Sequence, residues 1–183
     1  MVKNETLGLY CKMKIWVNEV PDECKNVEKG DIYVYKANKD ITWFSGTLCL
    51  ELRIAPRAAS NYAMLGFRFA QDDSGFLKIV YMLNKKDKIV TSDIAAPRDT
   101  VSNDIVKKYY EILIKMFDEL SMKNTFPSGI LEILGGRCGS IGSSNIAVIT
   151  VAKILIALFE LGEKFEKSDI NEIILEGCKG KLK

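Results

Sequence analysis

The sequence predicts an α+β protein folded as a two-layer sandwich, in which a mostly antiparallel sheet carries two helices packed on one face. Its first half alternates apolar and polar residues in short segments, which is typical of half-buried strands. Its second half contains two longer segments with apolar residues at helical spacing. With 183 residues, of which 48% are hydrophobic and 27% charged, the chain can bury one core without disulfides or metal ions.

The predicted strands follow one another through the first half of the chain. Alternation marks them at residues 12–17, 31–36, 47–54, 62–69, 76–83 and 89–91. The Asp-Asp-Ser-Gly segment at 72–75 predicts a tight hairpin, and the charged segment at 20–29 predicts a loop. In the three clearest strands, 47–54, 62–69 and 76–83, we expect one face in the core and the other face in water.

The first predicted helix runs to residue 122, with Ser102 or Asn103 as its N-cap. A strand at 130–134, a glycine-rich loop at 135–142 and, near the end of the chain, a last strand at 170–175 complete the sheet.

The second predicted helix begins at Ser143 or Ser144 as N-cap and is terminated by Gly162. It is apolar on nearly every side. We therefore expect it in the centre of the molecule, either between the sheet and the first helix or at an oligomer interface.

The domain organisation predicted from these elements has one core domain at residues 46–176 and a frayed tail at 177–183. The N-terminal residues 1–45 form strands or a hairpin that belong either to the core sheet or to a separate unit. No apolar segment follows a basic start, as in a secretory signal, and the apolar stretch at 146–161 is too short to span a bilayer. We expect a cytoplasmic protein without membrane contact.

The absence of histidine is the strongest chemical constraint. It excludes Ser-His-Asp and Cys-His catalysis and histidine metal ligation. The five cysteines contain no Cys-x-x-Cys pair, so we expect free thiols and neither a zinc site nor a redox motif. We favour a non-catalytic protein without metal or other cofactor. The alternative is an enzyme that uses carboxylate, lysine, tyrosine or cysteine.

The glycine-rich loop before the second helix is a candidate phosphate-binding site. Glycines allow a ligand to approach the backbone closely, and the amides at a helix start attract anions. The candidate residues are Gly136, Arg137, Gly139, Ser140, Gly142, Ser143 and Ser144. The alternative is an ordinary strand-to-helix turn with glycine at positive φ and serine as cap.

The water-exposed face of the sheet is a candidate nucleic-acid-binding surface, because basic and aromatic side chains share it. The candidate residues are Arg53, Arg68, Tyr62 and Lys78, together with Lys85 and Lys86 in a basic turn that adds phosphate attraction. The alternative is a solvated strand face on which Glu51 pairs with Arg53 or Arg68.

Carboxylates surround the entry to the first helix: Asp93, Asp99 and Asp104, beside Arg98. They suit either acid–base or metal chemistry, or helix capping alone. Cys138 near a helix start is a further candidate, as a nucleophile, but no base partner is evident.

Part of the C-terminal half resembles a known family. Residues 139–147, Gly-Ser-Ile-Gly-Ser-Ser-Asn-Ile-Ala, are similar to the Gly-Ser loop and Ser-Ser helix start in domain IV of translocation GTPase elongation factors. Residues 128–133 lie where that domain has its preceding glycine turn and strand. The segment 139–144 also resembles the phosphate loop of GHMP small-molecule kinases, which share that fold.

The resemblance implies a four-stranded sheet with two helices on one face and a left-handed βαβ crossover, and a preference for RNA or phosphate. It covers residues 47–176 as an order of elements and 129–147 as residues. The chain departs from both families. It has no GTPase domain, lacks the histidine-bearing segments and the proline that opens the kinase loop, and leaves no room for a second kinase domain.

Three functional hypotheses follow. The first is a non-catalytic binding module that contacts RNA or a ribonucleoprotein such as the ribosome through the basic sheet face and the Gly/Ser loop. The second is a protein that binds a phosphate-bearing small molecule or nucleotide at the loop. The third is a protein-interaction or self-assembly module, a homo-oligomer formed through the apolar second helix.

Overall fold

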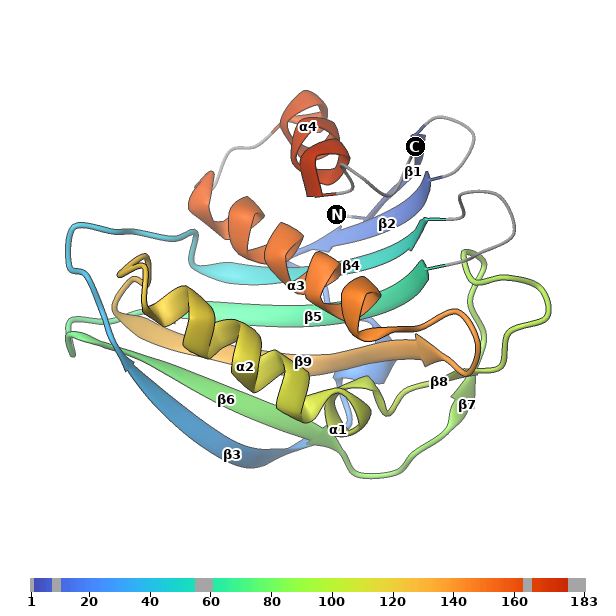
Figure 1. Cartoon of the computed structure of the whole chain (residues 1–183), viewed down its shortest axis with the longest axis horizontal. Helices are drawn as coiled ribbons and strands as arrows, with labels where there is room; N and C mark the ends of the chain where they lie inside the picture. Colours follow the sequence, from blue (N-terminus) through green and yellow to red (C-terminus); the bar gives the residue numbers. More distant parts are fainter. Residues whose placement is uncertain (1, 8–10, 55–60, 163–165, 178–183) are drawn as a thin grey trace.

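The computed structural model describes residues 2–7, 11–54, 61–162 and 166–177 and confirms an α+β fold (Figure 1). The strands are β1 (Val2–Leu7), β2 (Cys11–Val17), β3 (Val27–Lys36), β4 (Gly46–Ile54), β5 (Asn61–Gln71), β6 (Phe76–Asn84), β7 (Ile89–Val90), β8 (Val101–Ser102) and β9 (Gly129–Gly139). The helices are the short 3-10 helix η1 (Asp22–Cys24), α1 (Ile105–Lys108), α2 (Tyr110–Ser121), α3 (Asn145–Glu160) and α4 (Lys167–Gly177).

The sheet has the strand order β1-β2-β4-β5-β9-β6-β3, with the small β7–β8 hairpin attached to the end of β9. Neighbouring strands are antiparallel except for the parallel pair β6–β9. The described part of residues 1–45 therefore belongs to the core sheet: β1 and β2 extend it at one side, and β3 forms the other edge. Part of the predicted loop at 20–29 is in fact η1 and the start of β3.

The predicted hairpin at 72–75 is wrong, because β9 lies between β5 and β6. The Ser128 side chain fills the turn that connects them: its hydroxyl accepts from the Gly75 amide (2.9 Å) and donates to the Asp72 carboxylate (2.9 Å). The turn at 72–75 thus passes over the beginning of β9 on its way from β5 to β6.

The connection from β6 to β9 passes through α1 and α2. In Figure 1, which shows the helix side, β6 and β9 both point right and β9 lies above β6, so this βαβ crossover is left-handed. Most βαβ crossovers have the opposite hand. The sheet has more strands than the four that the resemblance implies.

The helices form one layer on the sheet, and α4 packs against α3 (Figure 1). The first predicted helix is divided at Tyr109 into α1 and α2. The strand predicted at 170–175 is wrong. Ile170 and Ile174 are buried at a spacing of four residues, which places both on one face of a helix.

Helix α3 is buried, as predicted, but it lies beside α2 on the sheet and not between the sheet and the first predicted helix (Figure 1). Ser144 is its N-cap and accepts a hydrogen bond from the Ala147 amide, and Gly162 follows its last turn with φ +90°. Its apolar side chains pack against β4, β5, α2 and α4. No helix among the described residues is long and apolar enough to cross a membrane.

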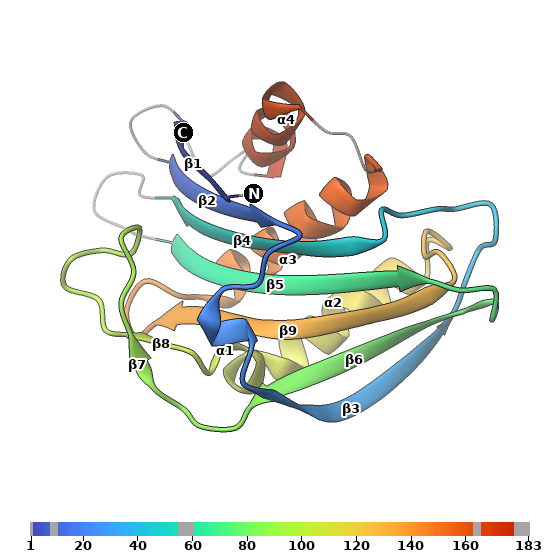
Figure 2. The same ribbon diagram turned by 180° about the vertical axis from the view of Figure 1, so that it is seen from behind.

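The sheet face opposite the helices is covered over only part of its area (Figure 2). Residues of η1 and the segment before β8 cross one half, so Cys49, Glu51, Tyr62 and Met64 are buried. The prediction that this whole face meets water is therefore wrong for one half of the sheet.

Candidate functional site

A β-bulge in β9 determines where Arg137 points. The pairing with β5 shifts between Gly66, which lies opposite Gly135, and Phe67, which lies opposite Ile133. Gly135 accommodates the bulge with φ +116°. The extra residue moves Arg137 to the sheet face away from the helices. The predicted loop at 135–142 is accordingly strand up to Gly139.

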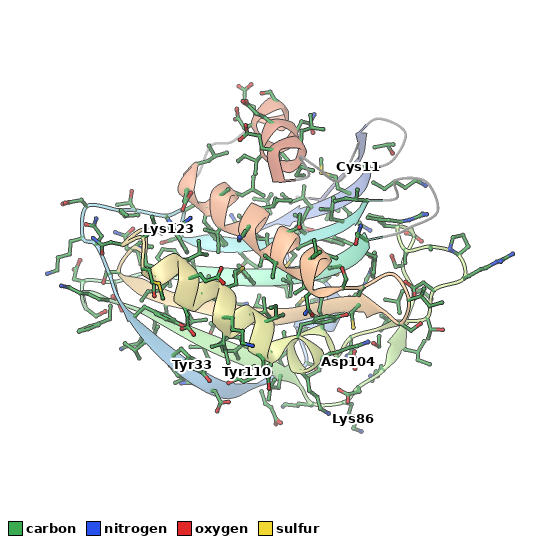
Figure 3. All side chains as sticks on the ribbon, in the orientation of Figure 1. Cys11, Tyr33, Lys86, Asp104, Tyr110 and Lys123 are labelled. Atoms are coloured by element: carbon green, nitrogen blue, oxygen red, sulfur yellow. The ribbon has the colours of Figure 1, made fainter. Side chains whose placement is uncertain are left out.

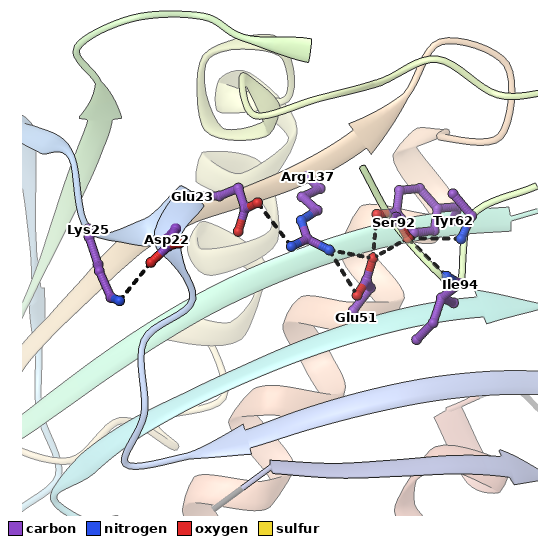
Figure 4. Close-up of polar contacts among 9 residues, drawn as sticks. Asp22, Glu23, Lys25, Glu51, Tyr62, Ser92, Ile94 and Arg137 are labelled. Carbon is purple, nitrogen blue, oxygen red and sulfur yellow. Dashed lines mark hydrogen bonds and ion pairs between the residues drawn. The ribbon is translucent and has the colours of Figure 1, made fainter. Parts of the chain in front are cut away.

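Arg137 forms the centre of a buried charge network (Figure 4). Its guanidinium donates to Glu51 at 3.1 and 3.2 Å and to Glu23 at 2.9 Å. Glu51 also accepts from the hydroxyls of Tyr62 and Ser92, both at 2.6 Å. The Glu51 side chain is only 1% exposed, so three donor groups make four hydrogen bonds to a carboxylate that water does not reach.

The pKa shifts in this network keep Tyr62 neutral and Arg137 charged. Burial raises the pKa of Tyr62, and the charge of Glu51 raises it further, so the phenol remains a neutral donor. Burial acts to lower the pKa of Arg137, but the charges of Glu51 and Glu23 outweigh it and raise the pKa. Arg137 is therefore engaged internally and does not present its guanidinium to the Gly/Ser loop.

The amides of the Gly/Ser loop bind a carboxylate of the protein itself. Asp99 accepts from the backbone N–H groups of Ile141 and Gly142, both at 2.9 Å, and from the Ser140 hydroxyl at 3.2 Å. The loop does form an anion-binding concavity, as its composition predicts. Its anion is the Asp99 side chain.

The two serines of the loop are also engaged. The Ser143 hydroxyl donates to the Tyr62 carbonyl (2.6 Å) and accepts from the Gly139 amide (2.7 Å), and Ser144 caps α3. A Cβ on Gly139 or Gly142 would meet the Asp99 carboxylate within 2.5 Å, which shows how tightly the loop encloses it. An external phosphate would have to displace Asp99 from this loop.

Asp104, at the entry to the first helix, accepts hydrogen bonds from neighbouring side chains. Burial acts to raise the pKa of Asp104, but hydrogen bonds from Ser102 and the Cys138 thiol lower it. Burial raises the pKa of Cys138 to about 12, which makes it a poor nucleophile at neutral pH. Among the described residues, no group of Cys, Asp and Glu side chains is arranged to hold a metal ion.

The structure separates the predicted nucleic-acid-binding residues into three places. Tyr62 is fully buried and Arg53 donates to the Ile94 carbonyl (3.4 Å), both on the covered half of the sheet face. Arg68 and Lys78 are exposed on the open half. Lys85 and Lys86 are exposed in the turn after β6. The structure therefore does not bring these residues together as one surface.

The open half carries apolar side chains that the sequence interpretation did not select. Ile32, Val34, Phe76 and Ile130 are 46%, 57%, 48% and 37% exposed, respectively. Lys78 lies among them, because it pairs in register with Val34 on β3 and with Ile130 on β9. We call these residues, Ile32, Val34, Phe76, Lys78 and Ile130, the open patch.

The charges around the open patch are mostly positive. Arg68 is paired with Glu132 at 3.0 Å, whereas Lys36 and Lys78 form no ion pair with the residues that the structure describes. A signal for this patch exists in the sequence: β6 has apolar residues on both of its faces, and Ile32 and Val34 alternate with two tyrosines. A strand with one wet face carries fewer apolar residues on that face.

No protein-family model, curated protein or solved structure matches this chain.

Proposed function

We propose that this chain is a protein-interaction module, and that the open patch docks a partner segment in which apolar side chains surround an acidic residue. The observation that carries this proposal is the cluster of four half-exposed apolar side chains on the uncovered part of an otherwise well-packed sheet. Contiguous apolar surface rimmed by polar residues is typical of interaction sites.

Burial of the open patch by a partner would contribute a sizeable part of a binding free energy. Full burial of a large apolar side chain contributes about 1.5–3 kcal/mol, and the patch leaves roughly half of four such side chains in water. Covering it would therefore contribute about 3–6 kcal/mol before the cost of association is subtracted. A gain of this size suits a partner that also makes polar contacts.

Lys78 defines the polar contact that the partner should make. It lies between Val34 and Ile130 with no ion pair to the described residues. Covering an ammonium group without a partner is costly, so a partner that buries this patch needs a carboxylate at its centre. This requirement favours an acidic protein segment.

RNA binding is the second candidate, and the position of Phe76 favours it. The ring is 48% exposed on β6, next to Lys78 along the strand and opposite Lys36 on β3, so a base could stack beside cations. The aliphatic side chains weigh against RNA, because Ile32, Val34 and Ile130 provide no stacking surface. Two unpaired lysines also neutralise few phosphates.

A peptide-display selection tests the proposal. Random short peptides are selected on the wild-type chain and counter-selected on Lys78→Glu, whose exposed position leaves the fold intact. We expect enriched peptides to carry Asp or Glu flanked by apolar residues. Their affinity should fall at least about tenfold on Lys78→Glu, because a charge-assisted contact of about 1.5–3 kcal/mol is lost.

A charge swap provides the decisive control. Replacing the acidic residue of a selected peptide by lysine should restore binding to Lys78→Glu, while the matched surface variant Lys115→Glu should bind the original peptide as wild type does. The absence of enriched peptides, or equal binding to Lys78→Glu, would contradict the proposal. Tight binding of mixed RNA that falls steeply with salt and is lost in Phe76→Ala would favour the second candidate.

A further inference from the structure

A cavity of about 480 Å³ lies at the other end of β6 from the open patch. It is open to solvent and lined by η1 and Asn26 on one side, and by the end of β6, the following turn and β7 on the other. The turn contributes three lysines, Lys85, Lys86 and Lys88. The opposite wall contributes Asp22 and Glu23. Figure 3 shows Lys86 at the outer edge of the molecule below Asp104.

The lysine turn is held in place by Asn103, which is only 6% exposed. Its side-chain amide donates to the Lys86 carbonyl (3.2 Å) and accepts from the Lys88 amide (2.7 Å). The Lys85 amide donates to the carbonyl of Asn26 on the opposite wall (3.2 Å). Side chains of this turn are therefore presented from a fixed backbone, which lowers the entropic cost of binding a ligand.

The acidic side chains around the cavity have ion-pair partners, whereas its three lysines have none among the described residues. Both acids of the wall already have partners: Asp22 pairs with Lys25 at 2.7 Å and Glu23 pairs with Arg137 at 2.9 Å. The acid of the turn, Asp87, pairs with Lys107 at 3.1 Å. Lys85, Lys86 and Lys88 form no ion pair with any residue that the structure describes.

We propose that this cavity binds a small phosphate-bearing molecule, with the phosphate against the three lysines and the hydroxyl or amino groups of the ligand against Glu23 and Asn26. Lysine ammonium groups suit phosphate oxygens as point charges. Glu23 offers its Oε2, which has no hydrogen-bond partner among the residues that the structure describes, since its Oε1 is paired with Arg137. Asn26 offers both a donor and an acceptor to the polar remainder of the ligand. A ligand with two chemically different ends therefore fits better than a bare anion.

The size of the cavity agrees with this ligand class. About 480 Å³ falls within the range of roughly 300–1,000 Å³ that is common for small-molecule sites. A mononucleotide or a sugar phosphate fills such a volume. The site is separate from the Gly/Ser loop, whose amides bind Asp99, and from the open patch, so its test is independent of the proposed protein interaction.

The experiment measures the melting temperature of the full chain, and binding by calorimetry, with inorganic phosphate, glucose 6-phosphate, AMP and ATP. Glucose and adenosine are the unphosphorylated controls. We expect at least one phosphate ester to raise the melting temperature in a concentration-dependent way. Its unphosphorylated counterpart should bind at least about tenfold more weakly, since charge-assisted contacts are lost. Inorganic phosphate should bind more weakly than the ester.

Two matched triple variants locate the site. Lys85→Ala/Lys86→Ala/Lys88→Ala should weaken binding of the ester by at least about tenfold, because contacts to charged groups contribute about 1.5–3 kcal/mol each. Lys39→Ala/Lys123→Ala/Lys153→Ala removes the same charge from exposed lysines elsewhere and should bind as wild type does; Figure 3 shows Lys123 far from Lys86.

Several outcomes would overturn the proposal. It fails if none of the four phosphates stabilises the chain, if adenosine or glucose binds as well as its ester, or if both triple variants lose binding equally. Inorganic phosphate that binds as tightly as the esters would contradict the role given to Glu23 and Asn26. Single-stranded RNA that binds through the three lysines more tightly than AMP or ATP would reassign the cavity to nucleic acid.

Discussion

A guanidinium in a protein interior is stable only where its charge and its donors have partners. The two terminal nitrogens of Arg137 meet this condition with Glu51 and Glu23, whereas its buried Nε has no hydrogen-bond partner among the described residues. Glu51 accepts in addition from Tyr62 and Ser92. The Arg137 side chain is 13% exposed, so solvent screens these charges little. Each member therefore depends on the others being present.

Replacing Arg137 by methionine should show this dependence. The Arg137→Met variant leaves Glu51 and Glu23 buried without their cation, and we expect it to lose about 3–5 kcal/mol of unfolding free energy in urea titrations. The triple variant Arg137→Met/Glu51→Gln/Glu23→Gln removes the charges together and should recover most of this loss.

Arg68→Met is the matched control for this measurement. Arg68 pairs with Glu132 on the open half of the sheet face. Loss of this ion pair should therefore lower the free energy of unfolding by less than about 1 kcal/mol. Equal destabilisation by Arg137→Met and Arg68→Met would show that the network contributes no more than a surface ion pair.

At the scale of single residues, the sequence predicted the core better than the candidate sites. Alternation predicts one buried face for the strands at 47–54 and 62–69, and Leu48, Leu50, Leu65 and Phe67 are buried on that face. Burial against the helices follows the two-residue period of a strand. It could not assign Tyr62 and its neighbours on the opposite face. Their burial depends on distant segments that cross the sheet, and no local pattern encodes that crossing.

At the scale of elements, β9 and the loop after it show why composition alone did not predict the structure of residues 135–142. The two consecutive glycines, Gly135 and Gly136, predict the start of a loop, yet they form a bulge that keeps the strand intact and turns Arg137 to the other face. The amides of the following loop do bind an anion, but the predicted phosphate position is filled by the protein itself. Its occupant, Asp99, lies about forty residues earlier in the chain, beyond the reach of any short motif.

The loop should depend on the Asp99 carboxylate. In Asp99→Ala, the amides of Ile141 and Gly142 lose their acceptor, and we expect a loss of roughly 1–3 kcal/mol in unfolding free energy. Formate or acetate should restore part of the stability of the variant by occupying the loop, and should leave the wild type unchanged.

Asp93→Ala serves as the control, because Asp93 is exposed and makes no hydrogen bond to the described residues; it should change stability by less than about 0.5 kcal/mol. If Asp99→Ala is as stable as wild type, the loop does not need an internal anion. If formate stabilises both chains equally, its effect lies elsewhere.

At the scale of the whole molecule, the buried thiols report on the integrity of the fold. Cys11, Cys24, Cys49 and Cys138 are buried: Cys24 of η1 lies against Cys49 of β4, whereas Cys11 and Cys138 belong to β2 and β9. Burial raises the pKa of Cys138 to about 12, and hydrogen bonding with Cys49 together with burial raises that of Cys24. Both shifts slow alkylation, because the thiolate is the reactive form.

Alkylation of a Cys178→Ser variant should therefore follow global unfolding. We expect iodoacetamide at neutral pH to leave all four thiols unmodified in buffer and to modify them together across the urea transition, as mass spectrometry would show. Rapid modification of one thiol under native conditions would mean that its part of the sheet opens separately.

The fold class could be predicted from the sequence because periodicity and turn residues act locally. The order of the strands could not. Residues 72–75 have the composition of a hairpin, but pairing depends on which strand fills the neighbouring position, and here that strand begins at Gly129. The candidate sites lie where such distant segments meet, so they too became visible only in three dimensions.

The central position of β9 has a consequence for how the chain matures during its synthesis. The strands on either side of it leave the ribosome early, but they have no common neighbour until residues 129–139 have been made. Until then each flank exposes an unpaired edge next to a half-formed core, the condition under which nascent chains aggregate or recruit chaperones. Translation of this one late segment therefore joins the two halves of the sheet, and α3, which follows it, then completes the core.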